Sequence, residues 1–477
     1  MRKNNRLSPG DSDENQAVPA MVLPLSGFCF YDHETAVMEC AASFTLFIFQ
    51  FYDSLTVLVR SITGLRTNVN VIDNSYRLHY CSFFFRETQR NRKKMDYPQK
   101  LLKVLSGKQI AAGFAGLTFG LLSVTAQAVT VTDVAGRTVT VPDDVQRVVL
   151  GEGRLFFALS LLEGQKPFDR IVGWQGDFRK LDPQTYATYR AKFPQIDNIP
   201  LIGTTSADTI SPEKVLTLNP QLAIFGLSGH GPGKGSELVK QLQNAGVPVV
   251  FVDFRTSPLK NTLPSMELLG KVLNREKQAQ EYIRFYQENI KRVTDVTRDI
   301  PMQDKPKVFI ELRASTADEC CRSAGNGNMG DFIDLAGGVN IAKPLLPGAL
   351  GQVNLEKVIA AQPDVYLVSG GARPPKAGDP QPVSLVLGAQ TTPEQASASL
   401  KPLLARKGIS TLKAVQEGRS FGIWHNYYNS PYNVLAVQYF AKAFYPQKFA
   451  GLDPQETQKQ LYKQFLAVEP TGTYWTE

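Results

Sequence analysis

Residues with distinctive chemistry are scarce in this chain of 477 residues. It has five cysteines, four histidines and three tryptophans. It has no His-Glu-x-x-His metal motif and no Gly-x-Ser-x-Gly nucleophile elbow. The glycine-rich stretch from Gly229 to Ser236 lacks the spacing of a phosphate-binding loop. We therefore expect a protein that is not an enzyme. The alternative is an exported α/β metal-dependent enzyme, which needs a cluster of carboxylates and histidines that this sequence does not supply.

Two further features are absent. The net charge of +8 is spread along the chain without a dense Lys/Arg run, so we expect no nucleic-acid partner. No apolar run reaches the ~20 residues of a comfortable membrane span. What the chain has is 43% hydrophobic residues, which is enough for full cores in two or three domains.

A targeting signal lies inside the chain. A basic segment opens at Met95, an apolar run extends from Ile110 to Val124, and a small-x-small site ends at Ala128. This order predicts a cleavable signal peptide over 95–128 and a periplasmic protein that begins at Val129. Residues 1–94 show no domain pattern, and we interpret them as a non-native upstream extension. The alternative is a genuine cytoplasmic or membrane-anchored extension.

The cysteines agree with export. Only Cys320 and Cys321 follow the predicted cleavage site. In an oxidising compartment these neighbours can form a vicinal disulfide. Two free thiols in a loop are an equally good interpretation.

One sequence pattern occurs twice. Ser211 to Ile224 and Asn354 to Leu367 both read as a capping residue, a short helix, a proline stop and a buried strand. Each copy carries a glutamate in the first turn of its helix, Glu213 and Glu356. The repetition predicts two similar lobes and a bilobed binding protein.

The remaining pattern is typical of an α/β fold. A hairpin is predicted over 129–142, followed by short buried strands that alternate with helical stretches. Residues 276–298 predict one long helix without Gly or Pro. We predict two Rossmann-like lobes with open parallel sheets, over 129–257 and 304–477. Linker helices over 258–303 join them, and the ligand cleft lies between the lobes.

Several local motifs together resemble a known family. Asp133-x-x-Gly136-Arg137, the paired Glu-Lys-Val elements, and Gly330 to Asn340 occur in its order. The chain is similar to the periplasmic substrate-binding proteins of ABC importers for ferric siderophores, haem and cobalamin. The resemblance covers 129–477, with the binding domain at about 146–450. It implies a monomer without an intrinsic cofactor, whose partners are an inner-membrane permease and its ATPase.

The resemblance also implies that Glu213 and Glu356 dock the two lobes onto arginines of the transporter. The alternative is that both glutamates only complement a helix dipole, which contributes ~0.3–1 kcal/mol.

Strand-end loops carry groups suited to a large, anionic, aromatic ligand. Arginine forks bind carboxylate, catecholate or hydroxamate oxygens, and aromatic rings cover flat faces. We therefore predict an Fe(III)-siderophore as the ligand, with a haem- or cobalamin-binding protein as the alternative. The candidate ligand-binding residues are Arg154, Trp174, Arg179, His230, Lys234, Arg255, Arg313, Arg322, Trp424, His425, Tyr427 and Tyr428.

His425 has two interpretations. Its imidazole can complete the coordination shell of a chelated ferric ion. Alternatively, it is a hydrogen-bonding residue at the rim of the cleft.

Overall fold

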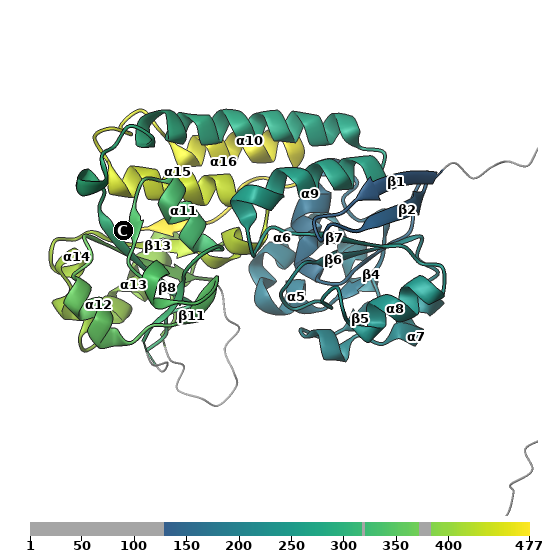
Figure 1. The fold of residues 1–477 in the computed structure, drawn as a ribbon, viewed down its shortest axis with the longest axis horizontal. Helices are drawn as coiled ribbons and strands as arrows, with labels where there is room; N and C mark the ends of the chain where they lie inside the picture. Colours follow the sequence, from purple (N-terminus) through teal and green to yellow (C-terminus); the bar gives the residue numbers. More distant parts are fainter. Residues whose placement is uncertain (1–127, 317–319, 372–382) are drawn as a thin grey trace, which may run out of the picture. The chain divides into compact units, whose positions relative to one another are not determined.

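The computed structural model describes residues 128–316, 320–371 and 383–477 (Figure 1). The predicted upstream extension, 1–94, and all but the last residue of the predicted signal peptide lie outside these ranges. Within them, no helix combines the length and the apolar character needed to cross a membrane.

The first lobe begins with the predicted hairpin and continues as a parallel sheet. Strands β1 (Ala128–Thr132) and β2 (Thr138–Pro142) pair antiparallel. The sheet that follows has the order β5-β4-β3-β6-β7, and all of its pairings are parallel. Its strands are β3 (Val148–Leu150), β4 (Ile171–Gln175), β5 (Leu201–Gly203), β6 (Leu222–Gly226) and β7 (Val249–Val252).

Both faces of this sheet are buried, as is typical of parallel sheets. Val149 and Phe225 belong to one hydrophobic core, whereas Leu150 and Ile224 belong to the other. The helices of the lobe are α4 (Phe156–Glu163), α5 (Asp177–Leu181), α6 (Pro183–Lys192), α7 (Pro212–Thr217) and α8 (Glu237–Asn244).

The second lobe repeats the architecture. Its sheet has the order β10-β8-β12-β13-β14, in which only the pairing of β13 with β14 is antiparallel. Its strands are β8 (Lys307–Leu312), β10 (Val339–Asn340), β12 (Val365–Gly370), β13 (Ser420–Trp424) and β14 (Trp475–Thr476). A separate antiparallel pair joins β9 (Arg322–Ala324) to β11 (Leu350–Gln352). Its helices are α11 (Met329–Leu335), α12 (Leu355–Ala361), α13 (Pro393–Leu404), α14 (Lys413–Gln416), α15 (Asn433–Phe444) and α16 (Pro454–Phe465).

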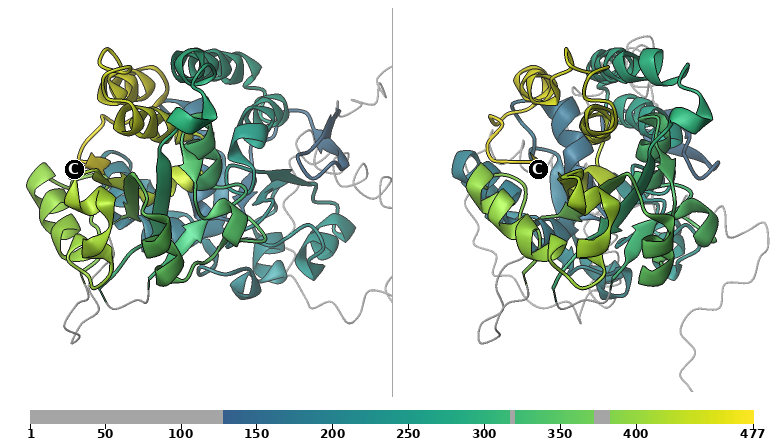
Figure 2. Two further views of the ribbon diagram at one scale, coloured as in Figure 1. Left: turned by 60° about the vertical axis from the view of Figure 1, so that its left-hand side comes forward. Right: turned by 90° about the vertical axis from the view of Figure 1, so that its left-hand side faces the viewer.

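Two helices connect the sheets. They are α9 (Pro258–Val272) and α10 (Glu276–Thr297). At 22 residues, α10 is ~33 Å long. Figures 1 and 2 show α10 beside the yellow C-terminal helices α15 and α16. The hydroxyl of Tyr286 on α10 donates to Oδ1 of Asn433 on α15 at 2.8 Å. The prediction of an α/β fold with two lobes and parallel sheets is confirmed.

The sequence repeat corresponds to one structural unit in each lobe. The Ser211 hydroxyl accepts from the N–H of Lys214 at the start of α7. Asn354 does the same for α12, through the N–H of Glu356. The valines at the third position of each Glu-Lys-Val, Val215 and Val358, are fully buried. Each unit therefore fixes its glutamate on the solvent side of a short helix.

Candidate functional site

Strand ends from both lobes surround a cavity of about 100 Å³. From the first lobe, His230 follows β6 and Arg255 follows β7. From the second, Arg313 follows β8 and His425 follows β13. The carboxyl ends of parallel strands therefore form the site, as expected for doubly wound sheets. The lining residues are His230, Arg255, Leu312, Arg313, Arg322, Asn328, Leu350, His425 and Tyr428.

The charge of the lining has one sign. Arg255, Arg313 and Arg322 contribute guanidinium groups, and none of the described lining residues is acidic. Guanidinium groups match the oxygen pairs of carboxylate-like and phosphate-like anions. The cavity is therefore suited to a small anion.

A rigid turn holds Arg255 at the end of β7. The buried carboxylate of Asp253 accepts from the backbone N–H groups of Arg255, Thr256 and Ser257, at 2.9, 2.7 and 3.0 Å. It also accepts from the side-chain amide of Asn261 at 2.7 Å. The Arg255 backbone is thus fixed before a ligand arrives, which lowers the entropy lost on binding.

Arg313 and His425 are linked through one serine. The Arg313 N–H donates to the Ser369 hydroxyl at 3.0 Å, and that hydroxyl lies 2.8 Å from Nδ1 of His425. Burial lowers the pKa of His425 well below its usual value, and the positive charge of Arg313 lowers it further. The His425 imidazole is therefore neutral at pH 7.

His230 is also neutral. Burial, reinforced by the charges of Arg154 and Arg255, lowers the pKa of His230 to about 4. Its Nδ1 lies 2.9 Å from the carbonyl oxygen of Thr205. A carbonyl only accepts, so Nδ1 carries the proton and Nε2 keeps a lone pair. The cavity thus has two uncharged imidazoles beside its three arginines.

Arg154 lies behind the cavity and does not line it. Its side chain is fully buried and its Nε donates to the Asp177 carboxylate at 2.8 Å. Its Nη1 donates to Asn426 Oδ1 at 3.1 Å and to the Tyr428 hydroxyl oxygen at 2.9 Å, both in the second lobe. Burial favours a raised pKa for Tyr428, but the charges of Arg154, Arg255 and Arg313 outweigh it and lower this pKa. Arg154 therefore connects the lobes through a buried polar network.

Glu152 completes this network. Its carboxylate is buried 3.8 Å from Nη2 of Arg154 and accepts from the Asn429 amide at 3.3 Å. Burial raises the pKa of Glu152, and the neighbouring Asp177 raises it further. Two buried carboxylates thus face one buried guanidinium.

The other predicted site residues lie away from the cavity. Trp174, Trp424 and Tyr427 are buried in the cores: Trp174 packs on Phe178, and Trp424 packs on Tyr427. A ligand in the cavity consequently has no access to these three rings. The remaining two predicted residues, Arg179 and Lys234, are exposed to solvent and do not line the cavity.

One lining residue with a polar side chain, Asn328, is absent from the prediction. It is the second asparagine of two glycine–asparagine steps, Gly325-Asn326 and Gly327-Asn328, directly before α11. Such a stretch signals positive φ, and the φ of Asn328 is 54°. The glycine–asparagine pattern thus predicts the local backbone conformation at this position, but it does not indicate that the residue lines a cavity.

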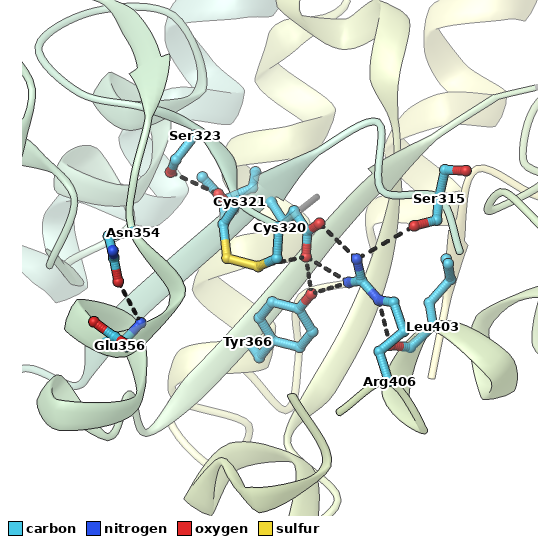
Figure 3. Close-up of a disulfide and its surroundings, with 11 residues drawn as sticks. Ser315, Cys320, Cys321, Ser323, Asn354, Glu356, Tyr366, Leu403 and Arg406 are labelled. Carbon is cyan, nitrogen blue, oxygen red and sulfur yellow. Dashed lines mark hydrogen bonds and ion pairs between the residues drawn. A yellow bond between two sulfur atoms is a disulfide. The ribbon is translucent and has the colours of Figure 1, made fainter. Parts of the chain in front are cut away.

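The two cysteines form a disulfide beside a buried ion pair (Figure 3). Cys320 Sγ lies 3.7 Å from Oε2 of Glu311. The Glu311 carboxylate accepts from both Nη atoms of Arg406, at 2.9 and 2.6 Å. The next residue after the disulfide is the cavity residue Arg322, at the start of β9.

The repeated glutamates are both exposed. Oε2 of Glu213 accepts from the Ser211 hydroxyl at 2.9 Å. Glu356 donates its backbone N–H to Asn354 Oδ1 at 2.7 Å. Neither carboxylate has a basic partner within 4.0 Å in the part of the chain that the structure describes.

A family model described as periplasmic binding protein matches residues 183–425. The chain belongs to this family. Because it is a periplasmic binding protein of the iron, B12 and siderophore type, the resemblance drawn from the sequence motifs is confirmed. It is the substrate-binding component of an ABC transporter. Members of this family are exported to the periplasm and work with a permease and an ATPase.

Individual relatives agree on this assignment. A structure of the TroA-like periplasmic binding protein FepB from Veillonella parvula is 28% identical, with a TM-score of 0.64, covering 73% of this chain and 99% of that one. The molybdate-binding protein MolA of Haemophilus influenzae is 24% identical over 355 residues, or 70% of this chain and 90% of MolA. A structure of MolA bound to molybdate has a TM-score of 0.55 at 20% identity and covers 72% of this chain and 99% of that one. These relatives are binding proteins, not enzymes.

Proposed function

We propose that this periplasmic binding protein captures a compact, oxygen-rich anion between its lobes and delivers it to its permease. The observation that carries the proposal is a cavity of about 100 Å³ with three arginines in its lining. Pockets for drug-sized ligands are roughly 300–1,000 Å³, so the cavity suits something much smaller. A tetrahedral oxyanion is of suitable size, and the molybdate of MolA is one example from a relative.

The second candidate is the ferric siderophore predicted from the sequence. It is supported by the family type and by the two neutral histidines and Tyr428 at the cavity. Imidazole and phenolate oxygen suit ferric iron. In this case the cavity holds only one charged edge of the chelate. Haem and cobalamin are less well supported, because both far exceed the cavity and cobalamin offers little charge to the arginines.

Calorimetry with protein stripped of ligand tests the two candidates. The panel contains molybdate, sulfate, phosphate and arsenate on one side, and a ferric catecholate and a ferric hydroxamate on the other. We expect a compact anion to bind most tightly. Binding of a ferric chelate, with no response to any of the four oxyanions, would favour the second candidate and overturn the first.

Arginine variants connect the binding to the cavity. A charge-assisted hydrogen bond contributes about 1.5–3 kcal/mol, so Arg255→Gln and Arg322→Gln should each weaken binding roughly ten- to a hundred-fold. Arg179→Gln is the matched control, because Arg179 is exposed and lies outside the cavity lining. Equal affinities for all three variants would remove the cavity from consideration as the binding site.

Docking onto the transporter is proposed for Glu213 and Glu356. Both are exposed, both start a short helix, and each lies in the same structural unit of its lobe. The two carboxylates could each form an ion pair with an arginine of the permease, one on each lobe and both at the start of an equivalent helix. A role limited to the helix dipole would also place an acidic residue at both helix starts, so a transport assay of variants at both positions has to decide between the two roles.

A further inference from the structure

Ser369 lies near the end of the middle one of three neighbouring strands in the second lobe. In the strand order β8-β12-β13, Ser369 of β12 pairs with Leu312 of β8 and with Ile423 of β13. Arg313 follows β8 directly, His425 follows β13 directly, and both line the cavity. The register of the sheet therefore brings the Ser369 hydroxyl into contact with both cavity residues.

The two partners of this hydroxyl determine where its proton lies. The backbone N–H of Arg313 donates to the hydroxyl oxygen at 3.0 Å, so this contact uses an oxygen lone pair. Among the described residues, only Nδ1 of His425, at 2.8 Å, remains to accept the hydroxyl proton. Ser369 is fully buried, and a buried donor without an acceptor is costly. Ser369 therefore donates to Nδ1 of His425.

This contact fixes the tautomer of His425. The lone pair is on Nδ1, so the single proton of the neutral imidazole is on Nε2. Nε2 has no hydrogen-bond partner among the described residues, yet it is not one of their buried unpaired atoms, so it keeps accessible surface. Because His425 is only 9% exposed and lines the cavity, we assign this surface to the cavity wall.

We infer that Ser369 positions His425 as a hydrogen-bond donor to the ligand. The inference rests on the proposed function, because it specifies how the cavity contacts an oxyanion. An oxygen of the anion accepts from Nε2–H of His425 in addition to the guanidinium groups. In this tautomer the cavity side of the ring carries a proton and no lone pair, which leaves His425 no role as a ligand to iron.

His230 provides an internal comparison. Its Nδ1 lies 2.9 Å from the carbonyl oxygen of Thr205, which only accepts, so the proton of this imidazole is on Nδ1. The two histidines of the cavity are therefore in opposite tautomers, and one sample contains both patterns.

Nitrogen NMR of ligand-free protein with isotope-labelled histidine tests the tautomers directly. A ring nitrogen that carries a proton and one that carries a lone pair have well-separated chemical shifts, and His230→Gln and His425→Gln assign the signals. At neutral pH we expect the proton on Nε2 of His425 and on Nδ1 of His230. A proton on Nδ1 of His425 overturns the inference.

Variants of Ser369 test its positioning role. In Ser369→Ala the two nitrogen shifts of His425 should move toward the average of exchanging tautomers, whereas Ser369→Thr keeps the hydroxyl and should keep the wild-type pattern. Ser323→Ala is the matched control, because Ser323 is a fully buried serine of the same lobe whose hydroxyl donates to the Ile310 carbonyl. Wild-type shifts in Ser369→Ala overturn the role of Ser369.

Calorimetry tests the contact with the ligand, using the tightest binder among molybdate, sulfate, phosphate and arsenate. His425→Leu removes the donor and should weaken binding about ten- to a hundred-fold, the range for one charge-assisted hydrogen bond. His425→Gln offers an amide N–H and should recover most of the loss. Wild-type affinity in His425→Leu overturns the inference while the proposed function stands.

Failure of all four anions to bind overturns the proposed function, and a ferric chelate then tests the role of His425. The same visible absorption of the bound chelate in the wild type and in His425→Leu agrees with a hydrogen-bond donor. A shifted charge-transfer band means that His425 ligates iron, and it overturns the inference.

Discussion

Arg154 offers the sharpest test of how this site is organised. The sequence predicts it as a ligand-binding residue, but the structure has it fully buried, with Nε bonded to Asp177 and Nη1 bonded to Tyr428. We predict that Arg154→Met mainly destabilises the fold. Methionine retains much of the side-chain length and removes the charge, which leaves Asp177 and Glu152 as two buried carboxylates without a cation.

The magnitude follows from that arrangement. Removing one partner of a buried ion pair typically costs about 3–5 kcal/mol. For a domain of this size class each kcal/mol lowers the melting temperature by roughly 2–4 °C, so a fall on the order of 10 °C is expected. Calorimetric and denaturant unfolding measure it. Because burial and Asp177 already raise the pKa of Glu152, protonation relieves the repulsion, and the deficit should shrink as the pH is lowered.

Two further variants make the test decisive. Arg154→Met combined with Asp177→Asn should recover part of the lost stability, since the remaining cluster then carries only one carboxylate. Arg255→Met removes a cavity arginine and should weaken ligand binding with a much smaller effect on unfolding. If Arg154→Met unfolds like the wild type while its ligand affinity collapses, Arg154 contacts the ligand directly and our account of the buried network is wrong.

The remaining predictions concern transport, pH and redox state. Replacing both Glu213 and Glu356 by alanine should abolish uptake in cells while calorimetry shows unchanged ligand affinity; normal uptake would refute docking. Folding lowers the pKa of His230 from 6.5 to about 4. Between these two pH values the unfolded chain binds a proton at this histidine and the folded protein does not. The contribution of His230 to the free energy of unfolding therefore decreases as the pH drops from about 6.5 to about 4. His230→Gln should flatten that part of the stability curve relative to the wild type, and an identical slope would contradict it. Reducing Cys320–Cys321 should weaken ligand binding several-fold, because Arg322 follows directly; unchanged affinity would mean that the pairing of β9 with β11 positions this arginine unaided.

The fold could be predicted because its signals are local. The hairpin over 129–142, the buried strands and the long helix after 275 each follow from patterns within a few residues, and the structure has all of them. The Glu-Lys-Val repeat also identified two similar units correctly, because capping and a proline stop are encoded within one short segment.

The site could be predicted only in part. Strand-end position led to Arg255, Arg313 and His425, and the structure places all three in the lining of the cavity. Trp174 lies near the end of β4 and Arg154 shortly after β3, yet both are buried away from the cavity. Position along a strand determines the edge of the sheet at which a residue lies, whereas the direction of its side chain depends on partners distant in sequence. For Arg154 those partners are Asp177, Asn426 and Tyr428. The sequence around Arg154 contains no pattern that predicts these contacts.

Helix α10 forms hydrogen bonds with both lobes, and this affects how a fluorescent sensor could be built from this protein. Its Asn289 and Tyr286 bond to residues of α15 in the second lobe, while Arg275 at its start bonds to Glu163 of the first lobe, at 3.0 Å. A pair of dyes on opposite lobes would consequently report little change in distance when ligand enters. A single environment-sensitive dye at position 326, exposed beside the cavity loop, is the better design, since its signal depends on local polarity and not on hinge motion.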